Sequence, residues 1–163
     1  MTTTSHTTID TALGALTLVN GHDGALRGLY FPGHWHLPAA GAFGPRAEDG
    51  FSLAATQLRE YLAGERSRFE LTTATVGEPF QERVWALLRE LPYGETTTYG
   101  ELARELGYDA SMARAVGGAV ARNPISIVIP CHRVLGSDGK LTGYAGGLDR
   151  KRALLALEAR GRG

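Results

Sequence analysis

The chain has 163 residues, 43% of them hydrophobic, and its 17 Lys and Arg are balanced by 17 Asp and Glu. This length allows one domain, or two small ones that share an interface. The formal net charge is zero, so the chain as a whole has no positive field that would attract a nucleic acid. No apolar run approaches a membrane span, and the opening MTTTSHTTID has neither the basic nor the apolar region of a signal peptide.

The chain contains a single cysteine. One thiol excludes an internal disulfide and a cysteine-rich zinc site, and it fits a reducing cytoplasm. His34 and His36 alone are too few to indicate a metal site, so we expect loop or packing roles for them. No metal and no cofactor are predicted.

Short β-prone runs dominate the first third of the chain. Turn signals at residues 13–14 and 21–24 separate them. The predicted strands are 7–11, 15–20 and 25–31. Residues 51–63 carry apolar residues at helical spacing, and residues 69–75 are expected to return as another strand.

The character of the sequence becomes helical from Pro79 onward. The predicted helices are 80–91, 98–106, 111–122 with Ser111 as N-cap, and a last one that Asp149 caps and that ends near Arg160. Between the last two helices, residues 125–129 are expected to be extended and to lead to the cysteine. The predicted fold is α+β: a small antiparallel sheet domain with a helix, residues 1–76, packed on a helical domain, residues 77–163.

The second and third predicted helices are joined by a short turn that contains glycine. This pattern matches a helix-turn-helix, although any helical hairpin also fits it. On the third helix, Ser111, Arg114, Gly118 and Arg122 share one face at spacings of three and four. Each mid-helix glycine costs roughly 1 kcal/mol relative to alanine. Either tight helix packing or the close approach of a nucleic acid would offset that cost.

A local basic stretch overlaps this helix. No acidic residue lies between Asp109 and Asp138, whereas Arg114, Arg122 and Arg133 do. Such a stretch is compatible with contacts to a phosphate backbone and equally with an ordinary solvated face.

The cysteine lies in the sequence IPCHRV, where Cys131 directly precedes His132. A thiol needs a neighbouring base to become a nucleophile at neutral pH. Glu158 lies at the edge of an apolar stripe on the last predicted helix, where a buried carboxylate requires a partner, and His132 is the obvious candidate. From the residues alone, the alternatives are a cysteine hydrolase, a helix-turn-helix regulator and a purely structural cysteine.

The run RAVGGAVARNPISIVIPCHRVLGSDGKLTGYAGGLDRKRALLALE closely resembles the O6-alkylguanine-DNA alkyltransferases, also called methylated-DNA–protein-cysteine methyltransferases. FQERVWALLRELPYGETTTYGELA resembles the same family, so the likeness is dense over residues 79–158. The segment TIDTALGALTLV resembles the small sheet domain of the family only loosely.

The resemblance implies a direct-reversal repair protein that transfers an alkyl group from O6-alkylguanine, and O4-alkylthymine as a further substrate, to Cys131 once. His132 would deprotonate the thiol through a water, Glu158 would hold His132, and Asn123 would brace the active-site turn. A non-catalytic damage-binding relative is the alternative. Such proteins carry another residue at the cysteine position, so Cys131 argues against it.

The resemblance also implies roles in binding duplex DNA through the minor groove, as a monomer. Arg114 matches an arginine finger that enters the stack, and Tyr99 matches the tyrosine that assists nucleotide rotation. The remaining predicted residues are Ser111, Gly118 and Arg122 at the DNA and Val134, Tyr144 and Ala145 at the guanine pocket. Ala145 stands where some members carry serine, and the zinc ligands of some members are absent.

Overall fold

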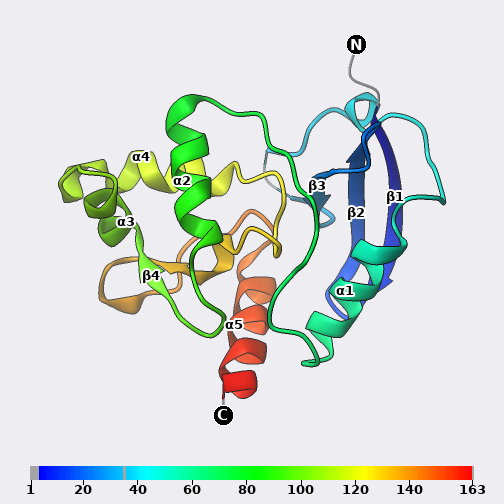
Figure 1. Ribbon diagram of the computed structural model, residues 1–163. Helices are drawn as coiled ribbons and strands as arrows, with labels where there is room; N and C mark the ends of the chain where they lie inside the picture. The colour runs from blue at the N-terminus through cyan, green and yellow to red at the C-terminus, as the bar shows by residue number, and fades with distance from the viewer. Residues whose placement is uncertain (1–3, 35, 163) are drawn as a thin grey trace.

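The computed structural model describes residues 4–34 and 36–162. A three-stranded sheet with one helix lies on one side of the molecule and the helices α2, α3 and α4 lie on the other (Figure 1). This arrangement confirms the predicted α+β class. Within the described residues, no helix combines the length and the apolar character needed to cross a membrane.

The sheet is antiparallel with the order β1 (Thr4–Thr11), β2 (Gly14–Gly21) and β3 (Leu26–Tyr30). Thr11 pairs with Gly14 across a two-residue turn, where Gly14 has a φ of 107°, a conformation that glycine adopts without strain. The helix α1 (Ser52–Leu62) covers the sheet and buries an apolar stripe that ends in Tyr61.

The prediction of a fourth strand at residues 69–75 was wrong. This segment makes only one isolated bridge, between Leu26 and Thr73. Leu26 donates to Thr72 O at 2.9 Å and accepts from Ala74 N at 3.0 Å, so a single residue of β3 uses its whole pairing capacity there. The chain then continues as a linker to α2.

Caps in the sequence define the helices α2 (Pro79–Arg89) and α3 (Tyr99–Glu105). Pro79 occupies the first helical position of α2, and the Glu78 N–H donates to Gln81 Oε1 at 3.0 Å. Thr98 caps α3 by accepting from Glu101 N at 3.1 Å.

The prediction that Ser111 caps the third helix was wrong by two residues. A 3-10 turn, Ala110–Met112, precedes α4 (Ala113–Ala121), and Asp109 is the residue that caps it. Asp109 Oδ1 accepts from Ser111 N at 2.9 Å and also from the Ser111 hydroxyl. Ser111 therefore lies inside the turn, and Asp109 supplies the capping oxygen. The two helices and this turn form the helix-turn-helix.

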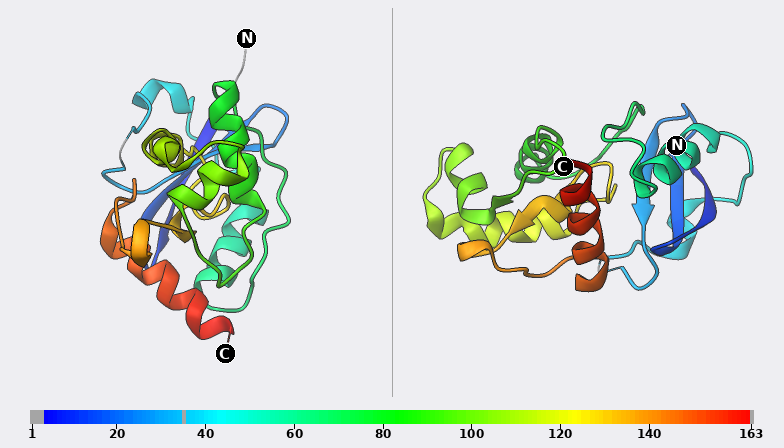
Figure 2. Two further views of the ribbon diagram at one scale, coloured as in Figure 1. Left: turned by 90° about the vertical axis from the view of Figure 1, so that its left-hand side faces the viewer. Right: turned by 90° about the horizontal axis from the view of Figure 1, so that it is seen from below.

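The last helix, α5 (Leu148–Arg162), lies between the sheet side and the helix-turn-helix (Figure 2). Asp149 belongs to its first turn and does not precede the helix. Two short strands, β4 (Thr97–Thr98) and β5 (Val134–Leu135), pair in parallel and tie the start of α3 to the segment after the cysteine.

One buried apolar cluster runs through both sides of the molecule. Trp85 of α2 anchors α4 by donating from Nε1 to Ala119 O at 2.9 Å. The division of the chain at residues 76–77 stays a prediction.

Candidate active site and DNA-binding face

The cysteine follows a tightly wound segment and not the extended stretch predicted for residues 125–129. Val128 N donates to Ser126 O at 2.8 Å, and Ile127 between them has a φ of 72°. A β-branched residue rarely adopts this left-handed conformation, so the turn is strained and must be held by its surroundings. Cys131 then begins a one-turn 3-10 helix, Cys131–Arg133.

Asn123 holds this segment from inside. Its Nδ2 donates to Ile129 O at 2.8 Å and its Oδ1 accepts from Ile125 N at 3.0 Å. The amide is buried and thereby clamps both ends of the strained turn. These are the contacts that a bracing residue needs.

His132 and Glu158, which the sequence analysis paired, are in contact. His132 Nε2 lies 2.7 Å from Glu158 Oε2, and both side chains are buried. Because the carboxylate can only accept, Nε2 carries the proton and Nδ1 is left as the basic nitrogen. His132 Nδ1 is buried and makes no hydrogen bond to any residue that the structure describes.

The Glu158 carboxylate is surrounded by donors. Arg133 donates from Nε to Oε1 and from Nη2 to Oε2, both at 2.8 Å. Gly94 N donates to Oε1 at 3.1 Å, and the Tyr61 hydroxyl donates to Oε2. Hydrogen bonds from His132 and Arg133 hold the pKa of Glu158 far below its usual range, although burial alone would raise it.

Burial dominates the acid–base properties of the thiol and the imidazole. It raises the pKa of the Cys131 thiol, while hydrogen bonding from Asn123 and the charge of Lys151 oppose the rise. It also lowers the pKa of His132, against the opposing effect of Glu158. At neutral pH the resting pair is therefore a neutral thiol beside a neutral imidazole, and the nucleophile must be generated by proton transfer.

Cys131 opens into a cavity of about 120 Å³. Its lining residues come from α3, α4, the 3-10 turn at Cys131 and the loop 143–145, and they include the predicted Tyr99, Tyr144 and Ala145. The full lining is Tyr99, Gly117, Val120, Ala121, Cys131, Gly143, Tyr144 and Ala145. The predicted lining residue Val134 is absent from it, because its N–H donates to Cys131 O and its carbonyl accepts from Lys151 Nζ at 2.6 Å.

Lys151, on α5, holds the wall of this cavity. Its buried ammonium group donates to Val134 O, to Thr142 O at 2.8 Å and to Gly143 O at 3.4 Å. It thus ties the loop before Tyr144 to β5. Burial lowers the pKa of Lys151 to about 8.

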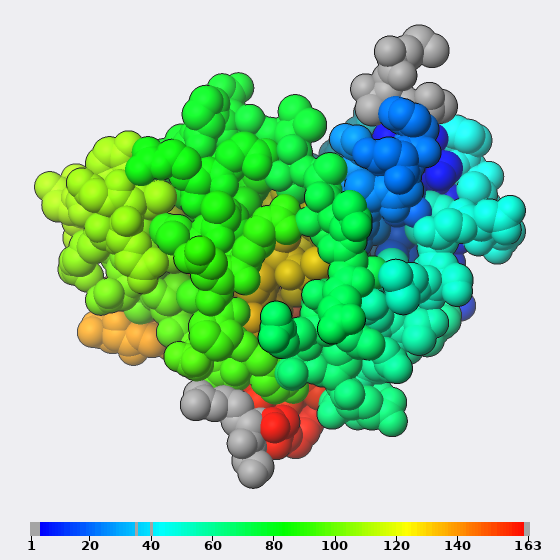
Figure 3. Space-filling model, viewed as in Figure 1, coloured from blue at the N-terminus to red at the C-terminus, as the bar shows by residue number. Residues whose placement is uncertain are grey.

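A larger cleft of about 660 Å³ opens on another face. Figure 3 shows it as a hollow between α2 and the linker that follows α1. Tyr93, Pro130 and Arg133 belong to its lining, but Cys131 does not. The reactive thiol therefore faces the small cavity and not this cleft.

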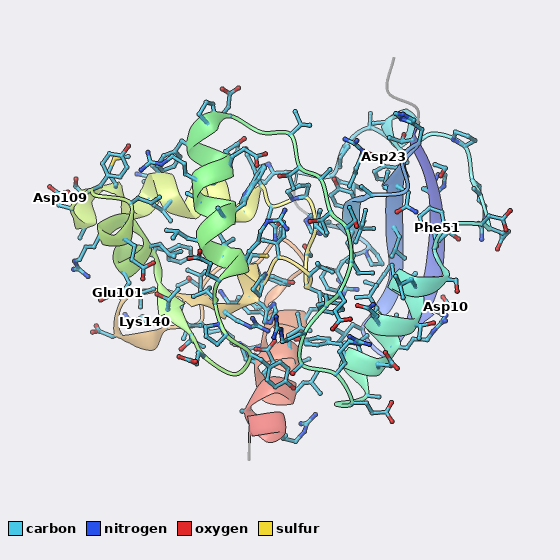
Figure 4. All side chains as sticks on the ribbon, in the orientation of Figure 1. Asp10, Asp23, Phe51, Glu101, Asp109 and Lys140 are labelled. Atoms are coloured by element: carbon cyan, nitrogen blue, oxygen red, sulfur yellow. The ribbon has the colours of Figure 1, made fainter. Side chains whose placement is uncertain are left out.

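The outer face of α4 carries the predicted DNA-binding residues. Arg114 and Arg122 are exposed, and Arg122 Nη1 donates to Gly118 O at 3.2 Å. Ser111 is exposed beside Asp109, which lies at the far tip of the helix-turn-helix in Figure 4. Arg133 is not on this face, since it is buried against Glu158, so the predicted basic stretch is reduced to two arginines.

Three buried polar residues of the site were missed in the sequence: Tyr61, Arg133 and Lys151. Lys151 shares its buried face of α5 with Leu154 and Glu158, and that spacing could have flagged it. Nothing local in the sequence marks Tyr61, because it reaches the site from α1, 97 residues before Glu158.

Fold and site together define a class: a helix-turn-helix protein with one buried cysteine beside a histidine–glutamate pair. Residues 79–160 match the family described as 6-O-methylguanine DNA methyltransferase, DNA binding domain. The chain belongs to this family. Among the described residues, no group of three or more His, Cys, Asp or Glu could hold a metal ion.

Named relatives agree with this membership over two thirds of the chain or more. The methylated-DNA–protein-cysteine methyltransferase of Mycolicibacterium paratuberculosis is 48% identical over 155 residues, 94% of this chain and 91% of the relative. That of Methanosarcina acetivorans is 54% identical over 68% of this chain and 70% of the relative.

Solved structures give the same result. The O6-methylguanine methyltransferase of Mycobacterium tuberculosis is 46% identical, with a TM-score of 0.86 over 98% of this chain and 94% of that one. The DNA complex of the M. tuberculosis protein is 44% identical, with a TM-score of 0.85 over 96% and 94%.

Proposed function

We propose that this protein repairs DNA by transferring the alkyl group of O6-alkylguanine irreversibly to Cys131. The observation that carries the proposal is the thiol itself: it is the only cysteine, it opens into a small cavity under the helix-turn-helix, and it adjoins a histidine held by a buried carboxylate. Attack at the alkyl carbon requires a soft nucleophile, and the sulfur of Cys131 provides one.

The residues of the site suit each step of this reaction. His132 Nδ1 would take the thiol proton through a water, and Glu158 would stabilise the imidazolium that forms without itself being protonated. Sulfur then forms a bond to the alkyl carbon, the carbon–oxygen bond breaks, and guanine leaves with that electron pair and takes up a proton. Burial raises the pKa of Tyr99, so its hydroxyl stays protonated and is a donor at the pocket.

The product would be a thioether on Cys131. A thioether is a poor electrophile, and the chain has no second thiol to attack it. Each molecule should therefore act once.

The same proposal places duplex DNA on α4. O6 of guanine is inside the duplex, so the nucleotide must be flipped out, at a cost of a few kcal/mol. Arg114 would fill the gap in the stack, and the small Gly117–Gly118 surface would admit the minor groove, where readout is degenerate. We propose a monomer working in the reducing cytoplasm.

Intact mass measurement tests the proposal directly. The protein is incubated with duplex DNA containing O6-methylguanine, and we expect a gain of one CH₂ on the Cys131 peptide, with one guanine restored per protein. Multiple turnovers would indicate a hydrolase instead. Cys131→Ala should abolish transfer while leaving DNA binding intact, and loss of binding would make the cysteine structural.

The same assay also tests the second substrate and the non-catalytic alternative. With a duplex that contains O4-alkylthymine, a mass gain on Cys131 would show that the pocket accepts that base. A non-catalytic damage-binding role would require binding to the lesion with no mass gain on Cys131.

A further inference from the structure

Tyr61 brings a hydroxyl from the sheet side of the molecule into the active-site cluster. The side chain is fully buried on α1, and its hydroxyl donates to Glu158 Oε2. The same carboxylate oxygen lies 2.7 Å from His132 Nε2, and the Tyr61 oxygen lies 3.4 Å from that nitrogen. Arg133 Nη2 also donates to Oε2, so three donors meet at one acceptor atom.

The direction of these hydrogen bonds is fixed by the chemistry of the partners. Glu158 stays ionised, so it only accepts. Burial and the neighbouring carboxylate raise the pKa of Tyr61 strongly, so the phenol keeps its proton and donates. His132 and Tyr61 therefore donate to the same oxygen. A stronger hydrogen bond from Tyr61 weakens the one from His132 Nε2, and this lowers the basicity of His132 Nδ1.

The aromatic ring of Tyr61 is held independently of its hydroxyl. It lies 5.2 Å from the ring of Phe69 and packs edge-on against Tyr93 at 6.1 Å. Removing the hydroxyl alone leaves these contacts in place. A phenylalanine here therefore tests the hydrogen bond and not the packing.

Other charged groups lie close to His132 and Glu158, and the variants used in the test must leave these groups unchanged. Arg133 and Lys151 both oppose a positive charge on His132. The Tyr93 ring lies 5.8 Å from the guanidinium of Arg133. In the part of the chain that the structure describes, Tyr93 interacts with Glu158 through its charge and not through a hydrogen bond. Tyr93→Phe is accordingly the matched control: it removes the same hydroxyl from the same aromatic cluster without removing a hydrogen bond to the carboxylate.

We propose that Tyr61 is a positioning residue for the alkyl transfer: through Glu158 Oε2 it fixes the orientation of the His132 imidazole and tunes its strength as a base. The inference rests on the proposed function. It also makes the sheet side of the molecule a contributor to the acid–base network, since Tyr61 lies outside the segment 79–160 that the family match covers.

The test measures the rate of Cys131 alkylation by free O6-benzylguanine between pH 5 and 9, which bypasses DNA binding and nucleotide flipping. Tyr61→Phe should slow the reaction at pH 7 by up to about 100-fold, the scale that a misplacement of a catalytic group by about 1 Å produces. The midpoint of the rate should move to higher pH, because Oε2 then stabilises the imidazolium more strongly. Site-specific 3-fluorotyrosine, a stronger donor, should move the midpoint to lower pH. Tyr93→Phe should change neither.

Nitrogen NMR of the His132 side chain makes the outcome independent of transfer. The pKa of His132 should rise in Tyr61→Phe and fall with 3-fluorotyrosine, while duplex binding stays at the wild-type value. An unchanged rate, midpoint and titration in both variants would overturn the inference. If wild-type protein does not alkylate Cys131, the proposed function fails, and the titration alone still decides whether Tyr61 acts on His132. If Tyr61→Phe does not fold, the fluorotyrosine variant carries the test.

Discussion

Arg133 and Glu158 form a two-pronged ion pair in the interior: Nε and Nη2 of the guanidinium each donate to a different carboxylate oxygen at 2.8 Å. Glu158 is 1% exposed. A third guanidinium nitrogen, Nη1, donates to Leu91 O at 2.6 Å. Arg133 thus balances the charge of Glu158 before any proton moves, and proton transfer from the thiol to His132 creates one new ion pair.

Breaking this pair should destabilise the fold. Arg133→Met leaves the Glu158 carboxylate buried without its counter-ion, and such changes cost about 3–5 kcal/mol. Urea unfolding at pH 7 measures the loss. Arg122→Met, at an exposed position, is the control and should stay close to wild type. A loss below about 1 kcal/mol for Arg133→Met would mean that the ion pair is not important for stability.

Gly118→Ala should separate stability from DNA binding. A Cβ at Gly118 would meet only Arg122 Nη1, at 3.6 Å, and one at Gly117 would meet only the Tyr99 ring, at 3.7 Å. Both are ordinary contacts, so the tight helix packing considered from the sequence does not explain these glycines. Alanine should stabilise the free protein by up to about 1 kcal/mol.

The added methyl group should weaken duplex binding, because it would meet the groove. Thermal unfolding and a fluorescence-anisotropy titration measure the two effects. Gly146→Ala is the contrasting control, since a Cβ there would lie 2.3 Å from Phe31 and should destabilise the protein itself. Unchanged DNA binding by Gly118→Ala would remove the argument that α4 approaches the groove.

Acid should destabilise the protein through a histidine remote from the thiol. His34 is 6% exposed, and burial lowers its pKa from 6.5 to about 4. Between pH 6.5 and about 4, His34 is protonated in the unfolded chain and neutral in the folded chain. The free energy of unfolding therefore falls as the pH is lowered through this range. The contribution of His34 is roughly 3 kcal/mol.

His34→Gln should therefore flatten the loss of stability on acidification. The measurement is the free energy of unfolding at pH 7, 5.5 and 4.5. The same substitution at the exposed His22 is the control. Buried His132 contributes a loss of the same sign, so His34→Gln removes part of the slope. An identical slope in wild type and His34→Gln would show that His34 is protonated as easily in the fold as outside it.

Local pattern was sufficient for the parts of the site that are neighbours in sequence or on one helix. Cys131 and His132 adjoin, and Glu158 stands out as an acid beside an apolar stripe. Caps and turns located the helices to within a few residues. The error at Ser111 arose because Asp109, two residues earlier, accepts from Ser111 N and so caps the 3-10 turn that precedes α4.

Contacts between distant segments could not be predicted in this way. Tyr61 has the helical spacing of a core residue, and only the packing of α1 against α5 turns its hydroxyl toward Glu158. Arg133 and Lys151 are residue types that usually lie on the surface. Both can be buried here because backbone carbonyls, and for Arg133 also the Glu158 carboxylate, accept their hydrogen bonds. Long-range acceptors of this kind leave no periodic signal in the sequence.

Arg114→Ala should impair repair of duplex DNA far more than reaction with free O6-benzylguanine. Arg114 is exposed and forms no ion pair with any residue that the structure describes, so we expect its replacement to leave the fold intact. If it fills the gap left by the flipped nucleotide, its removal returns part of an unstacking cost of a few kcal/mol, which slows duplex repair roughly tenfold or more. The free base needs no flipping and should react at the wild-type rate. Arg104→Ala, on α3 and paired with Glu101, is the control for the loss of a surface charge. Equal losses on both substrates would instead place Arg114 at the pocket, because only an effect on the chemistry is shared by a base that is flipped and one that is free.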